Sequence, residues 1–463
     1  MMASYGFGEK KAIVLGSCDS AVILAKYLVS KGAFVTLADP LANIEKQGEI
    51  TAKLGSVPVQ VICGDVGTNP FEGVSYVFVS ESYPSNSNLI EQAKMVGAEV
   101  IYEIDFIFTQ CDAEYIAVAG TNGKSTTAHL IKASLEKLGK KVFSNIDKPI
   151  SALLEGSVEF DYVVLVAEAA LLEAQKHFRP KQIVMLNLAE EQKDRYPDFE
   201  RYTDIYRSLL STVDASSTLI LNSQDLHIVS FVQGLSARTL FFGAQEVPNG
   251  FEGSWATKKS LFVSIKESSE LLSFSLDKMR LRGVHNRENI MAAALSVFPL
   301  GVTKAMFQEV LDEVRSLPHR LQFVKRLNSV AFYDDSASTN VSGVQRALQA
   351  FTEPVLLIMG GLDSKADYSV LAPLVRLKVK DLILVGSTKE KINRAIGDYT
   401  ETFIVGTMEE AILIAYQKSR SGDVVLLSPG CDSDEGFADL HARGDFFSEK
   451  VKFLSMPRRP NVI

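Results

Sequence analysis

The sequence predicts an α/β protein with three consecutive domains, each built around a largely parallel sheet. Three observations support this prediction. The 463 residues exceed what one hydrophobic core usually holds, since domains contain about 150 residues. Short runs rich in β-branched residues alternate with stretches of helical periodicity along the whole chain. A Gly-rich segment, AVAGTNGKSTT at 117–127, separates a predicted buried strand from a predicted helix.

The first domain, residues 1–110, is predicted to be Rossmann-like. KKAIVLGS is a predicted strand that runs into Gly16, SAVILAKYLVSKG is a predicted helix, and AFVTLADP is the next strand, which ends at Asp39. The turn GSCDSA keeps only Gly16 of the dinucleotide fingerprint G-x-G-x-x-G. We therefore expect a Rossmann-like domain that does not bind NAD.

Two further α/β domains are predicted after it. In the central domain, 111–316, the segments DYVVLVAEA, QIVMLNLA and STLILNS are strands separated by helical stretches, which is typical of a parallel sheet. In the third domain, 317–463, NSVAFYDDSA, PVLLIMGG, KDLILVGS, ETFIVGT and DVVLLSPG are strands, and each runs into Gly, Asp or Ser. Ligand loops of open sheets lie at such strand ends, so we expect a second Rossmann-like domain.

Composition excludes several classes of function. The hydrophobic share is 46% and the charged share 22%, and no apolar run reaches the ~18 residues of a membrane span. The net charge of −8, without any basic run, argues against a nucleic-acid partner. The cysteines have no paired spacing, which argues against disulfides and a zinc site. We expect a cytoplasmic monomer that does not insert into membranes.

The Gly-rich segment has the context of a phosphate-binding loop, or P-loop. Gly120 and Gly123 let the backbone N–H groups point inward, and the start of the following helix favours an anion. The Lys124 ammonium can reach the β- and γ-phosphates, and the Ser125 hydroxyl is placed to bind Mg²⁺. We expect ATP or GTP to bind the whole loop, which is formed by Gly120, Thr121, Asn122, Gly123, Lys124, Ser125 and Thr126.

A set of six motifs resembles the Mur ligase family, whose members join an amino acid to a carboxylate through an acyl phosphate. The motifs are GTNGKSTT, GVHNRENIMAAAL (283–295), LPHRLQ (317–322), YDDSASTN (333–340), MGGLDSKADYSVL (359–371) and LLSPGCDSDEGFADLHARGDFF (426–447). They occur in the usual order and cover nearly the whole chain. The resemblance implies a UDP-substrate-binding first domain, a central P-loop ATPase-like domain and an amino-acid-binding third domain.

The resemblance also implies the nucleotide site and its cofactors, ATP and Mg²⁺. Asn286 and Asn289 would lie at the nucleotide, and Arg320 and Asp335 would reach it from the third domain. A planar guanidinium suits phosphate, and a carboxylate suits ribose hydroxyls or the adenine side. Lys124, Arg320 and Asp335 are thereby expected to be the catalytic residues.

The implied substrates are a UDP-linked muramoyl peptide precursor and D-glutamate, in peptidoglycan precursor synthesis. Asp39 matches a uridine-contacting position, and Asn145 lies where the family binds near the muramyl group. Thr339 and Ser433 match positions that hold the D-glutamate carboxyl groups. The family's lysine in the fifth motif is replaced by Ser364, and Lys365 could supply that charge one residue later.

The metal-binding positions depart from the family pattern. Gln192 replaces a histidine, and the position of a carbamylated lysine falls on Arg207, or on Tyr206 if the alignment shifts by one residue. Val166 replaces a glutamate, but Glu168 lies two residues later, and a strand places both side chains on one face. Glu168 is therefore a candidate ligand of Mg²⁺ together with Ser125.

Two interpretations remain open. The first is a divergent D-glutamate ligase that uses one Mg²⁺ and substitute carboxylates, namely Glu168, Glu190 or Glu191. The second is a relative that binds nucleotide but is weakly active, non-catalytic or specific for another amino acid. A ligase of the folylpolyglutamate synthase type is disfavoured, because that group lacks a UDP-type domain before the P-loop.

The third domain also carries Ala337 where the family usually has a lysine.

Overall fold

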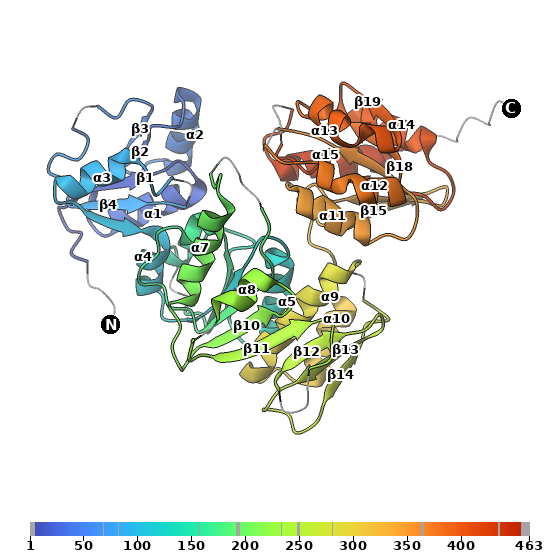
Figure 1. The fold of residues 1–463 in the computed structure, drawn as a ribbon. Helices are drawn as coiled ribbons and strands as arrows, with labels where there is room; N and C mark the ends of the chain where they lie inside the picture. The colour runs from blue at the N-terminus through green and yellow to red at the C-terminus, as the bar shows by residue number, and fades with distance from the viewer. Residues whose placement is uncertain are drawn as a thin grey trace.

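A computed structural model gives the fold of residues 5–67, 69–81, 83–156, 158–190, 195–232, 234–247, 251–279, 281–362, 365–433 and 436–454. The chain forms three sheets, one in each third of its length. Figure 1 shows the first sheet (blue) and the third (orange to red) on either side of the central one (green to yellow). The predicted α/β fold class is confirmed.

The N-terminal sheet is wholly parallel, in the order β3-β2-β1-β4-β5. The predicted strand–helix–strand opening is present as β1, α1 and β2. The strands are β1 (Lys11–Leu15), β2 (Phe34–Asp39), β3 (Val59–Cys63), β4 (Tyr76–Val79) and β5 (Glu99–Tyr102), and the helices are α1 (Asp19–Ser30), α2 (Ile44–Leu54), α3 (Asn88–Met95) and α4 (Glu103–Gln110).

The central sheet has the order β14-β13-β12-β11-β10-β9-β6-β8-β7. It is parallel from β12 to β7, whereas β13 and β14 add an antiparallel edge that was not predicted from the sequence. Its strands are β6 (Glu114–Ala119), β7 (Val142–Ser144), β8 (Tyr162–Ala167), β9 (Gln182–Met185), β10 (Thr218–Asn222), β11 (Arg238–Gly243), β12 (Gly253–Ala256), β13 (Ser260–Ser264) and β14 (Leu272–Ser275). Its helices are α5 (Lys124–Lys137), α6 (Ala169–Leu172), α7 (Phe199–Leu210), α8 (Leu226–Phe231), α9 (Val284–Val297) and α10 (Lys304–Glu313), with 3₁₀ turns η1 (Ile150–Leu154) and η2 (Phe298–Leu300).

The C-terminal sheet has the order β15-β16-β20-β17-β18-β19 and is parallel except for β15. Its five parallel strands are those predicted. The strands are β15 (Gln322–Leu327), β16 (Val330–Asp334), β17 (Val355–Met359), β18 (Val379–Leu384), β19 (Glu401–Ile404) and β20 (Val424–Leu427). The helices are α11 (Val341–Gln349), α12 (Ala372–Lys378), α13 (Lys389–Ile396), α14 (Met408–Lys418) and α15 (Leu440–Phe453), with η3 (Ser369–Leu371) and η4 (Gly397–Tyr399).

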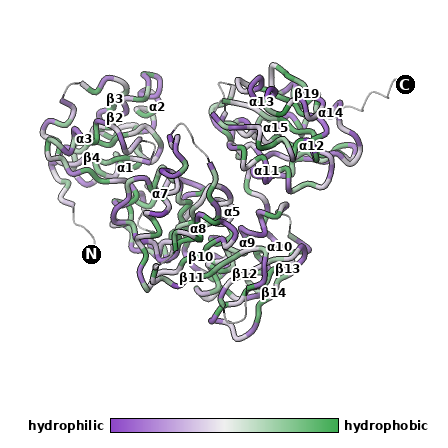
Figure 2. The backbone as a smooth tube through the Cα atoms, viewed as in Figure 1, coloured by the Kyte–Doolittle hydropathy of each residue, from purple (hydrophilic) through white to green (hydrophobic). Residues whose placement is uncertain are grey.

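Burial explains why the strands could be recognised in the sequence. Every residue of β16, β17 and β20 is buried, because helices cover both faces of a doubly wound sheet. Such strands are continuous apolar runs, and Figure 2 shows hydrophobic stretches along the strands of each sheet. Among the described residues, no helix combines the length and the apolar character that crossing a membrane requires.

The N-terminal and central domains share an apolar core, whereas the central and C-terminal domains do not. One apolar cluster contains Phe106 of α4 and Leu165 of β8, whereas the C-terminal domain has two apolar clusters of its own. The Asp105 carboxylate also accepts three backbone N–H groups, those of residues 176–178, at 2.8–2.9 Å. The C-terminal domain contacts the central one through polar pairs, such as Arg282 with Glu353 at 3.2 Å. Separating the C-terminal domain from the central one therefore requires less free energy than separating the central domain from the N-terminal one.

Candidate active site

The predicted P-loop connects β6 to α5, and α5 begins at Lys124. Gly120 and Gly123 have φ angles of +119° and +95°, which L-residues with side chains rarely adopt. A β-carbon on Gly120 would lie 2.7 Å from the Asn187 carbonyl oxygen, and one on Gly123 would collide with the Asn289 side chain. Only glycine therefore allows the loop to approach β9 and α9 this closely.

Asn187, which follows β9, fixes the shape of the loop. Its amide group accepts a hydrogen bond from the Asn122 backbone N–H at 3.0 Å and donates one to the Asn122 carbonyl at 2.8 Å. Its own carbonyl accepts from the Thr121 N–H at 2.8 Å. The Thr121 hydroxyl in turn accepts from the Ala189 N–H at 2.9 Å. Asn187 was not predicted from the sequence, although an asparagine directly after a buried strand was a usable signal.

Lys124 lies inside the loop with its ammonium group buried. The Nζ atom donates to the carbonyls of Gly120 and Thr121 at 2.7 and 2.8 Å. It also forms an ion pair with Glu168, whose Oε2 lies 3.1 Å away. Glu168 follows β8, so the structure brings this predicted carboxylate to the P-loop. An ammonium group held over the loop is placed to bind phosphate oxygens.

Arg320 connects the third domain to this loop, as predicted. Its Nη2 atom donates to the Ser125 hydroxyl at 3.2 Å. Burial lowers the pKa of the guanidinium, and the nearby carboxylates of Glu168 and Asp335 oppose that shift. A second cation therefore lies beside the first turn of α5, where negative charge would develop during phosphoryl transfer.

Asp335 directly follows β16 and is buried. One carboxyl oxygen accepts from the Leu321 N–H at 3.0 Å, and the other accepts from the Ser428 hydroxyl at 2.8 Å. Burial raises the pKa of Asp335 to about 7 in spite of these hydrogen bonds and one from Ser338. The group can therefore be either a donor or an acceptor towards a ligand near neutral pH.

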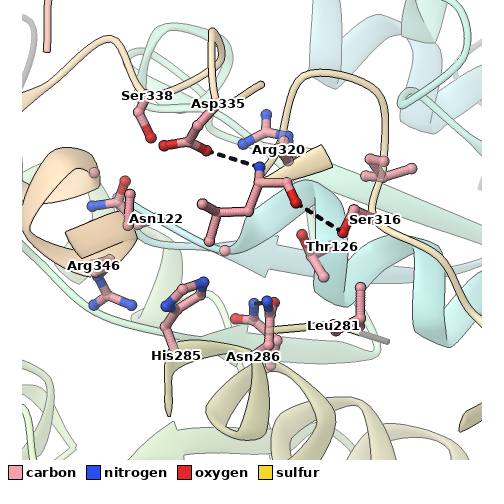
Figure 3. Close-up of a pocket in the computed structure, with 16 residues that line it drawn as sticks. Asn122, Thr126, Leu281, His285, Asn286, Ser316, Arg320, Asp335, Ser338 and Arg346 are labelled. Atoms are coloured by element: carbon pink, nitrogen blue, oxygen red, sulfur yellow. Dashed lines mark hydrogen bonds between the residues drawn. The ribbon is translucent and has the colours of Figure 1, made fainter. Parts of the chain in front are cut away.

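A cavity lies between the central and C-terminal domains and gathers most of the predicted nucleotide residues. Figure 3 shows Asn286 and His285 of α9 on one wall, with Asp335 and Ser338 across the cavity. Asn289 donates to Asn286 at 3.0 Å, and Asn286 donates to the Arg282 carbonyl at 2.6 Å. The lining residues are Asn122, Gly123, Thr126, Leu281, His285, Asn286, Asn289, Ser316, Leu317, Arg320, Leu321, Asp335, Ser338, Gly343, Arg346 and Ala347.

The predicted substrate residues lie outside this cavity. Asp39 is buried at the end of β2 and accepts from the Leu41 N–H at 3.0 Å. The Asn145 amide hydrogen-bonds both backbone groups of Val166, so it ties the end of β7 to β8. Thr339 follows β16 and is half-buried.

Ser433 and Lys365 lie at the ends of two further strands of the C-terminal sheet. Ser433 follows β20, and its buried Oγ has no hydrogen-bond partner among the described residues. Lys365 is exposed and has a left-handed φ of +56°. Ser364, Glu191 and Gln192 lie outside the described residues.

The two alternative positions of the family's carbamylated lysine face in different directions. Tyr206 faces the P-loop, with its hydroxyl 3.4 Å from the Gly120 carbonyl. Arg207 points away, because it pairs with Asp204 and lies over the Phe231 ring at 4.7 Å. The described residues contain no group of three or more His, Cys, Asp or Glu side chains that could hold a metal ion.

The remaining oxygen ligands fit one magnesium ion. Mg²⁺ commonly takes one or two carboxylates, with phosphate oxygens and water as its other ligands. The Ser125 hydroxyl and the Glu168 carboxylate are the predicted ligands, and they fit this need: Ser125 lies in the first turn of α5, and Glu168 pairs with Lys124, the first residue of that helix. Glu190 is exposed and directly follows Ala189, whose N–H binds the Thr121 hydroxyl of the loop.

The fold and this cavity define a P-loop enzyme in which two α/β domains line a cavity beside the loop. The chain belongs to the Mur ligase family: "Mur ligase middle domain" matches residues 118–297, and "Mur ligase, glutamate ligase domain" matches residues 319–431. The resemblance noted in the sequence is thereby confirmed. The chain is an ATP-dependent acid–amino-acid ligase of peptidoglycan synthesis.

Relatives and solved structures cover almost the whole chain. The UDP-N-acetylmuramoylalanine–D-glutamate ligase of Bdellovibrio bacteriovorus is 36% identical, over 96% of this chain and 97% of its own length. The enzyme of that name from Citrifermentans bemidjiense is 30% identical, over 96% of this chain and 98% of its own length. The UDP-N-acetylmuramate-alanine ligase of Thermotoga maritima shares the fold, with a TM-score of 0.58 at 16% identity over 96% of this chain and 99% of its own. The UDP-N-acetylmuramoylalanyl-D-glutamyl-2,6-diaminopimelate–D-alanyl-D-alanyl ligase of Acinetobacter baumannii also shares the fold, with a TM-score of 0.60 at 15% identity over 95% of this chain and 93% of its own.

Replacing Gly123 tests the shape of the loop. We expect Gly123→Ala to weaken ATP binding at least about tenfold, because the new β-carbon must displace Asn289 and the φ angle becomes strained. Gly139→Ala is the matched control, since Gly139 has a φ of +84° at the far end of α5 and a β-carbon there would meet no atom within 4 Å. Titration calorimetry of both variants checks this, and equal affinities would contradict it.

Replacing Asp335 tests its raised pKa. Burial raises this pKa from 3.8 to about 7, so the folded protein keeps a proton that the unfolded chain releases. The stabilisation from this group is complete below about pH 4 and is lost as the pH rises through 7. Between these limits, wild-type unfolding free energy should fall more steeply than that of Asp335→Asn, by up to ~1.4 kcal/mol per pH unit. Urea denaturation from pH 4 to 8 measures both slopes, and parallel slopes would refute the shift.

Proposed function

We propose that this chain joins D-glutamate to UDP-N-acetylmuramoyl-L-alanine at the cost of ATP. The terminal phosphate of ATP is transferred to the alanine carboxylate, which gives ADP and an acyl phosphate. The amine of D-glutamate then attacks the acyl carbon, and phosphate and a proton are released. Relatives with that name over their full length support the choice of substrates.

The observation that carries the proposal is the meeting of Arg320 and Ser125 across the domain boundary, at 3.2 Å. It brings a guanidinium of the third domain to the P-loop that already holds Lys124. Two cations beside the transferred phosphoryl group stabilise its charge in the transition state. A site completed by two domains also keeps water away from an acyl phosphate.

The same proposal assigns the remaining nucleotide residues. Asn286 and Asn289 bind the nucleotide from α9, and Asp335 binds the ribose hydroxyls or the adenine side from the third domain. Ser125 and Glu168 would hold one Mg²⁺, and its charge would offset the repulsion between the phosphate and carboxylate anions. Tyr206 then lies beside the loop as a neutral neighbour of that site.

The substrate residues follow from strand positions. β16 and β20 are adjacent parallel strands, so the segments after them, which carry Thr339 and Ser433, lie at the same edge of the sheet. The Ser433 hydroxyl, which has no partner among the described residues, suits a carboxylate of D-glutamate, and Lys365 supplies a charge at the neighbouring β17 end. Asp39 and Asn145 serve the uridine and muramoyl ends of the other substrate.

A second candidate function has its own support. Val166 is buried, and both Tyr206 and Arg207 lack the amine that a carbamylated lysine requires. These positions favour a relative that ligates weakly, or that uses another amino acid. Such a protein would keep the nucleotide pocket and would bind ATP without rapid turnover.

A three-reagent assay tests the main proposal. Purified protein with Mg²⁺ should release phosphate only when ATP, UDP-N-acetylmuramoyl-L-alanine and D-glutamate are all present, because the acyl phosphate needs both the carboxylate and the amine. Omitting each reagent in turn is the control. Absence of phosphate release over a range of Mg²⁺ concentrations would refute the proposal, and release with a different amino acid would favour the second candidate.

Glu168→Gln tests the proposed metal ligand. Removing the charge while keeping the size should raise the Mg²⁺ concentration for half-maximal phosphate release about tenfold. Glu155→Gln is the matched control, since Glu155 is an exposed carboxylate of the same domain. The Mg²⁺ dependence of phosphate release at saturating ATP checks this. An unchanged Mg²⁺ requirement would show that Glu168 is not a ligand.

A further inference from the structure

Arg346 lines the same cavity as Arg320, and the proposed function gives it no role. It lies on α11 of the C-terminal domain, and it lines the cavity together with Asn122 and Asp335. Its side chain is only 22% exposed, and its Nη1 lies 3.6 Å from an oxygen of Glu288 on α9. The pair therefore spans the boundary between the two domains.

The wall around Arg346 is lined by small or uncharged side chains. Gly343 and Ala347 lie on the same helix, three residues before Arg346 and one after, and add little bulk. His285 lies beside Arg346 (Figure 3), and burial, reinforced by the charges of Arg346 and Arg287, lowers the pKa of its imidazole to about 4. The wall thus presents a neutral imidazole next to a planar guanidinium.

The surroundings of Arg346 differ from those of the two phosphate-side cations. Lys124 and Arg320 both contact the P-loop or the first turn of α5 directly. Arg346 instead has its charge balanced by Glu288, with Asp225 as a further nearby carboxylate. A guanidinium whose charge is already balanced, and which lies beside small side chains, suits the face of an aromatic ring better than a phosphate.

We propose that Arg346 binds the nucleoside end of ATP, with its guanidinium stacked on the base and with Glu288 holding it in position. The inference rests on the ATP site of the proposed function but not on the substrates to be joined. Because Arg346 and Glu288 belong to different domains, the base is held fully only when the two domains are together. Arg320 belongs to the same domain as Arg346, so the contact that holds the base and the contact of Arg320 with the P-loop form together.

The experiment compares two nucleotides by calorimetry in the absence of the other substrates. Arg346→Met should weaken the binding of ADP and of the β,γ-imido analogue of ATP by the same factor, about tenfold, because both carry the same nucleoside. Arg320→Met, on the phosphate side, should weaken the analogue more than ADP. Arg346→Lys keeps the positive charge that pairs with Glu288 but lacks the planar guanidinium that would stack on the base. It should therefore also weaken the binding of both nucleotides.

Each result decides the assignment. Loss confined mainly to the ATP analogue would mean that Arg346 serves the phosphates, and unchanged binding of both ligands would mean that it serves neither. Because Glu288 holds Arg346 in position, Glu288→Gln should weaken both ligands, but by a smaller factor than Arg346→Met, since the guanidinium is still present. An equal loss would mean that the tie between the two domains, and not the stacked guanidinium, supports binding, and the assignment would be wrong. Melting temperatures verify that each variant is folded. Wild-type protein without ligase turnover would refute the proposed function and would leave these binding results to decide the role of Arg346.

Discussion

The closeness of the P-loop to its two neighbours is the constraint on which the rest of the site depends. The loop touches the residues after β9 on one side and α9 on the other, so that no β-carbon fits at Gly120 or Gly123. This approach lets Asn187 bind both backbone groups of Asn122, which sets the direction of the N–H groups at the start of α5. An anion site made of backbone depends on such support, because the loop alone has no rigid partner.

The three domains contribute to this site through two kinds of interface. The first and second domains share an apolar cluster and the Asp105 hydrogen bonds, so they form a continuous support for the loop. The third domain brings Arg320, Asp335 and Arg346 to the cavity, but it is attached by polar pairs. Polar interfaces of this kind separate more easily than apolar ones. The fold therefore places polar contacts around the cavity and apolar contacts beneath the loop.

Much of this arrangement was predictable from local sequence patterns. Buried parallel strands are continuous apolar runs, and the P-loop carries its glycines, lysine and serine in one short segment, so both were recognised. The antiparallel edge of β13 and β14 was not, because these strands have only five and four residues, too few for their alternation to stand out. The pair of Arg346 with Glu288 depends on a contact between distant segments. Neither partner in such a pair has a local signal of its own.

The side-chain alternation of β8 explains how a carboxylate can reach the loop from a different position. Val166 packs in the apolar cluster that contains Ala128 and Leu130 of α5, so its side chain lies on the α5 side of the sheet. A glutamate there would be buried among apolar groups, which is costly unless a cation or metal offsets its charge. Two residues on, the same side of the chain meets the start of α5, where Glu168 remains partly exposed and pairs with Lys124. Moving the carboxylate out of the strand thus keeps it directed towards Lys124 of the P-loop and lowers the cost of desolvating it.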